Sequence, residues 1–186
     1  MKRIIAVFIT FLFLLTLVGC SGDWQNQDAP EPESYAFNAQ YIRTGYSDDL
    51  NTPYHVVINS KKELEAYYEA NKERFDLAHG NPESAIGFLD ACDKYDDAYF
   101  EQQNLVLIVL AEGSGSVRHE ITDVRRAYDE NGASIGWAIT INRIVPETTS
   151  EDLALWHLFL EVQMGKMIDS DDKVWINGNL SEHANG

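Results

Sequence analysis

The residues that could perform chemistry in this chain are few and do not form a recognised catalytic set. His157 and Glu161 are four positions apart, as two metal ligands on a helix would be, but the apolar alternation around them indicates a strand. On a strand, residues four apart lie roughly 13 Å from each other, too far for one metal ion. A site would need His119 or His157 with carboxylates from other strands, so no metal is predicted. Cys92 lies in FLDACDKYDD, where acidic neighbours raise the pKa of a thiol and favour an inert cysteine over a nucleophile.

Acidic residues dominate the charge, with 30 Asp and Glu against 14 Lys and Arg and a formal net charge of −16. Such a charge repels nucleic acid, so no nucleic-acid partner is expected. The acidic runs IDSDDK and DKYDD lack the Gly and Glu positions of an EF-hand loop, and no cofactor is predicted. The fold could still bring carboxylates together, so an extracellular hydrolase stays open as the alternative function.

The glycine-containing segment GSGSVRHE, residues 113–120, leads into a strand and carries no lysine, unlike a phosphate-binding loop. We therefore expect a hairpin turn. Because loops on rigid scaffolds often carry function, this segment is also the candidate contact surface. The residues of that surface are Ser114, Ser116, Arg118 and Glu120.

Arg143 is in phase with three apolar residues of the same strand, namely Trp137, Ile139 and Ile141. It is therefore expected to be partly buried, and a buried guanidinium needs an acidic partner. The prediction is a structural ion pair between Arg143 and Glu147, with Glu161 and Glu120 as the other candidate partners. A ligand-facing arginine is the alternative.

The N-terminal residues 1–19 have the pattern of a secretory signal peptide. Lys2 and Arg3 are followed by an apolar run over residues 4–18, broken only by two threonines. As a helix this run would reach roughly 22 Å, less than the hydrocarbon core of about 30 Å. The run ends in Leu-Val-Gly-Cys at Cys20, which resembles the lipobox of bacterial lipoproteins and implies cleavage before Cys20 and its lipidation. An ordinary signal peptide and an uncleaved anchor are the alternatives.

The organisation expected after the signal peptide is a lipidated flexible tether over residues 20–34 and one globular domain over residues 35–186. The segment SGDWQNQDAPEPES is polar and holds two prolines, as tethers do, whereas the remaining length suits a single core. With Cys20 lipidated, Cys92 is the only remaining thiol, so no intrachain disulfide can form. The membrane is then a partner through the lipid, and the expected localisation is the cell envelope, on the outer side of the cytoplasmic membrane or in the outer membrane.

The periodicity predicts an α+β domain, with a mainly antiparallel β-sheet packed against one principal amphipathic helix. That helix is expected from Ser60, which has capping-box spacing to Glu63, to about Arg74. The run LVLIVLA is typical of a central strand that is covered on both faces. Strands are expected at 37–43, 54–58, 105–111, 117–128, 134–145 and 156–162, with a last edge strand at 174–176, and short helical pieces at 83–92 and 95–102.

A resemblance to a known family runs from residue 100 to residue 162, about a third of the chain. The segments FEQQNLVLIVL, GSGSVRHEITDV, WAITINRIVPE and WHLFLEV follow one another there. They resemble the C-terminal domain of the protease-complex subunit PrcB and a similar module of bacterial lipoproteins, although Ser116-Val117 stands where that family often has an aromatic residue. The resemblance implies an accessory role in assembling or stabilising a surface protease and supplies no catalytic residues. The expected function is thus a non-enzymatic surface lipoprotein that binds an extracellular protein or ligand.

Overall fold

The computed structural model describes residues 34–48, 51–79, 86–163 and 168–183. The predicted signal peptide and Cys20 lie outside these residues, as do nearly all of the tether and the first part of the helical piece expected at 83–92. Among the residues described, no helix is both long and apolar enough to cross a membrane.

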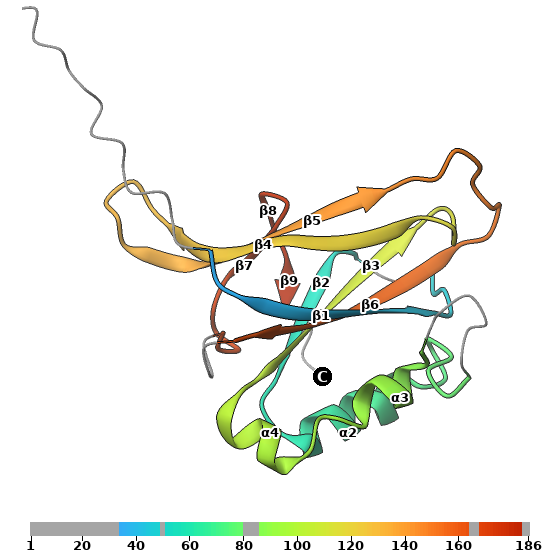
Figure 1. Ribbon diagram of the computed structural model, residues 1–186, viewed down its shortest axis with the longest axis horizontal. Helices are drawn as coiled ribbons and strands as arrows, with labels where there is room; N and C mark the ends of the chain where they lie inside the picture. Colours follow the sequence, from blue (N-terminus) through green and yellow to red (C-terminus); the bar gives the residue numbers. More distant parts are fainter. Residues whose placement is uncertain (1–33, 49–50, 80–85, 164–167, 184–186) are drawn as a thin grey trace, which may run out of the picture. The chain divides into compact units, whose positions relative to one another are not determined.

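Two mixed β-sheets and three helices make up the described fold (Figure 1), which confirms the predicted α+β, mainly β class. The five-stranded sheet has the order β1 (Phe37–Thr44), β6 (Ala154–Val162), β3 (Leu105–Glu112), β2 (Tyr54–Ile58) and β9 (Glu182–His183). The four-stranded sheet has the order β4 (Arg118–Tyr128), β5 (Ser134–Ile144), β7 (Val174–Ile176) and β8 (Asn179–Leu180). The helices are α2 (Lys61–Asn71), α3 (Phe88–Cys92) and α4 (Asp97–Gln102). Neighbouring strands are antiparallel except in the pairs β2–β9 and β5–β7.

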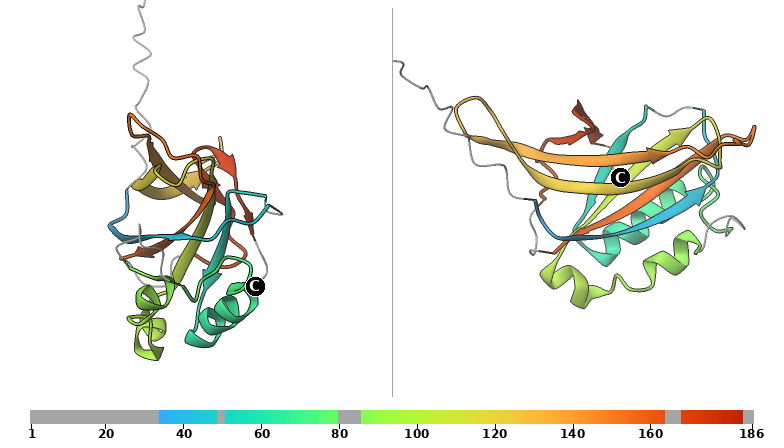
Figure 2. Two further views of the ribbon diagram at one scale, coloured as in Figure 1. Left: turned by 90° about the vertical axis from the view of Figure 1, so that its right-hand side faces the viewer. Right: turned by 45° about the horizontal axis from the view of Figure 1, so that its top comes forward.

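The five-stranded sheet is the middle of three layers, with the helices on one face and the four-stranded sheet on the other (Figure 2). Strand β3 lies between β6 and β2, as the unbroken apolar run predicts. Its residues Leu105, Leu107 and Val109 belong to the core on the helical side, and Val106 and Ile108 belong to the core between the sheets. Burial on both faces therefore explains why this strand has no polar alternation.

Helix α2 begins where the sequence predicts. The hydroxyl of Ser60 accepts a hydrogen bond from the backbone N–H of Glu63 at 3.2 Å, and the Glu63 carboxylate accepts one from the N–H of Asn59 at 2.7 Å. These bonds satisfy N–H groups that lack partners at the start of a helix. The helix ends at Asn71, before the predicted Arg74, because the chain continues in turns in which Asp76 takes a positive φ of 50°.

The last predicted strand is present but is not at the edge. Val174–Ile176 forms β7, which lies between β5 and β8. After β7 the chain reverses at Asn177 and Gly178, whose φ angles are 50° and 79°, and the two-residue β8 pairs with β7. A strand this short has no clear periodicity, which is why the sequence did not indicate that β8 covers β7.

Candidate functional site

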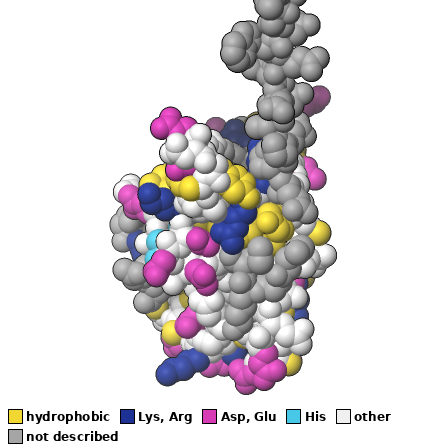
Figure 3. Space-filling model, turned by 90° about the vertical axis from the view of Figure 1, so that its left-hand side faces the viewer, with side chains coloured by type: hydrophobic (Ala, Val, Ile, Leu, Met, Phe, Trp, Pro, Cys, Tyr) yellow, Lys and Arg dark blue, Asp and Glu magenta, His cyan; other side chains and the backbone are white. Residues whose placement is uncertain are grey.

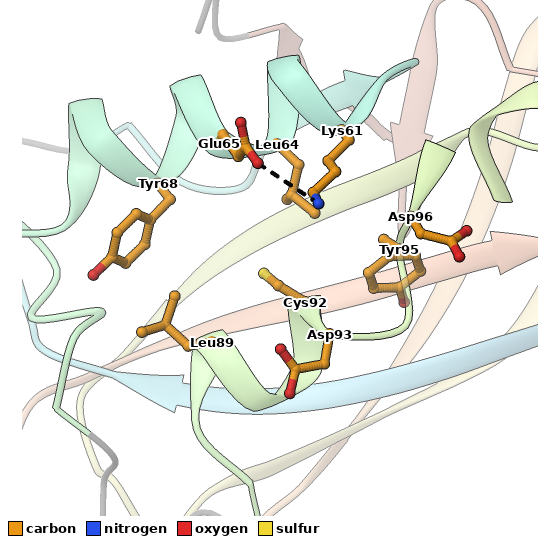
Figure 4. A pocket seen from close by; sticks show the side chains of 9 residues that line it. All are labelled: Lys61, Leu64, Glu65, Tyr68, Leu89, Cys92, Asp93, Tyr95 and Asp96. Carbon is orange, nitrogen blue, oxygen red and sulfur yellow. Dashed lines mark ion pairs between the residues drawn. The ribbon is translucent and has the colours of Figure 1, made fainter. Parts of the chain in front are cut away.

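A groove lies between α2 and the segment formed by α3 and the residues after it (Figure 4). Its volume is about 370 Å³. The apolar and aromatic lining consists of Leu64, Tyr68, Leu89, Cys92 and Tyr95. Leu64 and Tyr95 are buried, whereas Leu89 keeps 44% of its surface exposed and so offers an apolar contact to a partner.

The charged residues of this groove are mostly acidic. Glu65, Asp93 and Asp96 are three carboxylates, against the single ammonium of Lys61, which lies 4.0 Å from Glu65. Because these charges surround an apolar lining, the groove favours an occupant that has an apolar side chain flanked by positive charge. No sequence motif indicated the groove, since it arises only where two helices that are separate in the chain come together.

Cys92 lines the groove, and its thiol is half-buried. Burial, followed by the neighbouring charge of Asp93, raises the pKa of its thiol to about 12. The thiol is therefore protonated at neutral pH, and only the thiolate reacts readily. This confirms that the cysteine is half-buried, as predicted, whereas its inertness stays a prediction.

A second hollow, of about 230 Å³, opens between the two sheets and contains Glu112, His119 and Arg143. Glu112 ends β3, and the other two are cross-strand partners on β4 and β5. Only 8% of the Glu112 side chain and 4% of the His119 side chain are exposed, against 53% for Arg143. The Arg143 guanidinium donates to both oxygens of Glu112, with Nε to Oε1 at 2.8 Å and Nη2 to Oε2 at 2.7 Å.

The predicted ion pair between Arg143 and Glu147 is thus wrong, and so are the alternatives Glu161 and Glu120. Arg143 is also more exposed than predicted. Its partner Glu112 comes from β3, which the stacking of the two sheets brings against the end of β5, whereas Glu147 follows β5 and is exposed. A carboxylate that is already buried gains most from a bidentate guanidinium, because its lost hydration is then replaced.

His119 is neutral in this pocket. Burial lowers the pKa of its imidazole, the Glu112 carboxylate opposes this shift, and Arg143 adds to it. The imidazole Nε2 lies 3.3 Å from Glu112 Oε1 but is not aligned for a hydrogen bond. The pocket therefore holds a neutral imidazole and one carboxylate, whose charge is paired with Arg143. Glycoside hydrolysis needs two carboxylates.

The predicted contact surface at the Gly-containing turn is only partly available. The hydroxyl of Ser114 is buried and bonds those of Ser116 and Ser150, at 2.8 and 3.1 Å. Arg118 donates from Nη1 to the carbonyl of Gly115 at 2.7 Å, and its guanidinium lies 5.1 Å from the ring of Trp156. Of the four predicted residues, the structure leaves only Glu120 exposed, and Ser116 and Arg118 are half-buried.

His157 and Glu161 have structural partners on the helical side of β6. His157 is fully buried, with Nδ1 at 3.0 Å from the Thr44 hydroxyl and Nε2 at 2.8 Å from the Tyr67 hydroxyl. Glu161 pairs with Lys94 and accepts a hydrogen bond from Tyr95 at 3.0 Å. Within the described ranges, no group of three or more His, Cys, Asp or Glu side chains is arranged to hold a metal ion.

Comparisons of the chain with protein families, with curated proteins and with solved structures found no match.

Proposed function

We propose that this protein is a non-enzymatic, lipid-anchored binding module of the cell envelope. The anchor is Cys20, after a signal peptide too short to span a bilayer. The partner is an extracellular protein, and an accessory role in a surface protease complex, like that of the PrcB subunit, is the most specific form of the proposal.

The observation that carries the binding role is the groove between α2 and α3. Leu89, in the apolar lining of this groove, keeps 44% of its surface exposed. Three carboxylates also line the groove. Apolar contacts within a polar rim are the general anatomy of protein interfaces. The ionisable groups that could instead support catalysis are engaged internally: Glu112 binds Arg143, and His157 binds Thr44 and Tyr67.

The test is capture of partners from an envelope extract by the immobilised Cys20→Ser protein, which lacks the lipid. The variant Leu89→Glu places a charge in the groove, and Leu180→Glu is the matched control because Leu180 is 59% exposed on β8, in the other sheet. We expect the same protein to be captured by the parent and by the control, with at least tenfold less captured by Leu89→Glu. Equal capture by all three proteins would exclude the groove, and no capture by any of them would contradict the binding role.

The alternative is an extracellular hydrolase, and the pocket between the sheets is the feature that favours it. There Glu112 and His119 lie together in a hollow beside a half-exposed arginine. Against it, the Glu112 carboxylate is held by Arg143, and the residues lining the pocket include no second carboxylate. Hydrolysis of a chromogenic ester or glycoside that disappears in Glu112→Gln would establish the alternative over the binding role.

A further inference from the structure

The N-terminal tether joins the domain beside one particular hairpin. Ser34, the first residue described, pairs with Arg125 of β4 in an antiparallel bridge, and its hydroxyl donates to Asp123 Oδ1 at 2.6 Å. The N–H of Tyr35 donates to the carbonyl of Val124 at 2.8 Å, and the Tyr35 ring meets Trp137 edge-on at 5.2 Å. The chain is therefore fastened to the sheet before β1 begins, close to the β4–β5 hairpin.

The hairpin next to this attachment exposes apolar side chains. Tyr128, which ends β4, is 52% exposed, and Ile135, near the start of β5, is 37% exposed. Arg125 is three residues before Tyr128, or about 10 Å along the strand. Figure 3 shows this end of the molecule, where hydrophobic side chains lie among those of Lys, Arg, Asp and Glu.

The turn that joins the two strands is held in one shape. Gly132 has a φ of 78°, and the Asp129 carboxylate accepts hydrogen bonds from the N–H groups of Asn131 and Ala133 at 2.9 and 2.8 Å. These bonds lower the pKa of Asp129. A fixed turn limits the conformations of the hairpin end that carries Tyr128 and Ile135, which reduces the entropy lost on contact with a surface.

We propose that the β4–β5 hairpin is the membrane-facing end of the domain, with Tyr128 and Ile135 contacting the headgroup region of the bilayer; this inference rests on the proposed anchoring at Cys20. Thirteen residues separate Cys20 from Ser34, and this length reaches at most about 50 Å. Ser34 pairs with Arg125, three residues before Tyr128, so the hairpin lies close to the point where the tether meets the domain. The tether keeps the hairpin at a high effective concentration near the lipid, so a contact that is too weak to bind membranes alone can still form.

The chemistry of the hairpin suits a lipid interface. Tyrosine places its ring in the headgroup region with the hydroxyl in water, and arginine reaches phosphate while its stem covers apolar groups. The Arg125 side chain is 42% exposed beside Asp123, at 2.9 Å, and the Arg126 guanidinium stacks on Trp137 at 4.1 Å. Because Arg126 also lies 3.7 Å from Asp172, both arginines are paired with carboxylates, and the contact with the bilayer depends on Tyr128 and Ile135.

The test uses the chain from Cys20 onwards with Cys92→Ala, so that Cys20 is the only thiol. This thiol is coupled to a maleimide lipid in phosphatidylcholine nanodiscs. The nanodiscs also contain a lipid that chelates gadolinium. Amide NMR signals close to the headgroups lose intensity. We expect the signals of residues 128–135 to lose at least twofold more intensity than those of residues 145–153, which lie at the other end of β5. The double variant Tyr128→Ser/Ile135→Ser should remove this difference, whereas the matched control Val145→Ser/Leu153→Ser should keep it.

Two results would overturn the proposal. An equal or greater loss of NMR intensity at residues 145–153 would show that the hairpin is not the end of the domain that faces the membrane. A difference unchanged in the Tyr128→Ser/Ile135→Ser variant would mean that the tether alone holds the hairpin near the lipid, without contact. Because the coupling is chemical, both results are independent of whether cells acylate Cys20, which is measured separately.

Discussion

Tyr67 on α2 and His157 on β6 are joined by a hydrogen bond of 2.8 Å between the phenol oxygen and Nε2, in the core between the helices and the five-stranded sheet. Nδ1 of the same imidazole lies 3.0 Å from the hydroxyl of Thr44 on β1. One fully buried histidine thus connects a helix to two strands, and its burial lowers its pKa to about 3.

His157 should make the fold sensitive to acid. In the unfolded chain a histidine titrates near pH 6.5, so between pH 6.5 and about 3 the unfolded state binds one more proton than the folded state. This contribution to stability is complete above pH 6.5, and it falls by about 1.4 kcal/mol for each pH unit below that. Urea titrations between pH 4.5 and 6.5 measure how the free energy of unfolding changes with pH. We expect the slope to be smaller in His157→Gln, by the contribution of one bound proton, or about 1.4 kcal/mol per pH unit. An unchanged slope would contradict the assignment.

Trp156→Ala should be strongly destabilising. The side chain is 2% exposed in the core between the sheets, in edge contact with His119 at 5.9 Å and beneath the guanidinium of Arg118. Removing a buried Trp costs about 3–5 kcal/mol. Chemical denaturation measures this loss, and Val145→Ala, at a side chain 51% exposed, is the control with an expected change within about 0.5 kcal/mol.

The charges around His119 should move its pKa in opposite directions. Arg143 lowers the pKa of this imidazole and Glu112 raises it. We therefore expect a higher His119 pKa in Arg143→Gln and a lower one in Glu112→Gln, each followed by NMR titration of the imidazole protons. Shifts of the same sign in both variants would show that the substitutions act through altered packing instead of charge.

Cys20→Ser should move the protein from the membrane fraction to the soluble fraction without unfolding the domain, because the described cores are formed by residues between Tyr35 and Ile176. Fractionation and the melting temperature measure the two parts of this prediction. Mass spectrometry of the parent protein should find acyl mass on an N-terminal Cys20. Membrane association that persists in Cys20→Ser would contradict lipid anchoring.

Cys92 should resist alkylation while the protein is folded. Its thiol pKa of about 12 leaves almost no thiolate at pH 8, and the side chain is half-buried in the groove. In Cys20→Ser, where Cys92 is the only thiol, iodoacetamide should react at least tenfold more slowly in buffer than in 6 M guanidinium. Equal rates would show that the groove leaves this thiol open to solvent.

The sequence by itself predicted the positions of most elements and the faces they bury. The apolar residues at alternate positions of β6, the Ser60 cap of α2 and the apolar run of β3 are local patterns. They are set by the period of the backbone and by hydrogen bonds between near neighbours. The direction of the Cys92 pKa shift was predicted from its acidic neighbours, but its larger cause is burial, which depends on the tertiary structure.

Only the tertiary structure decided which faces meet. Periodicity shows that a strand has an apolar face but not which strand or layer covers it, so the division into two sheets and the partner of Arg143 were not predictable. Glu112 is 31 positions from Arg143, and the groove between α2 and α3 joins Leu64 to Leu89. These arrangements depend on contacts between distant parts of the chain, which exist only once the layers have packed together.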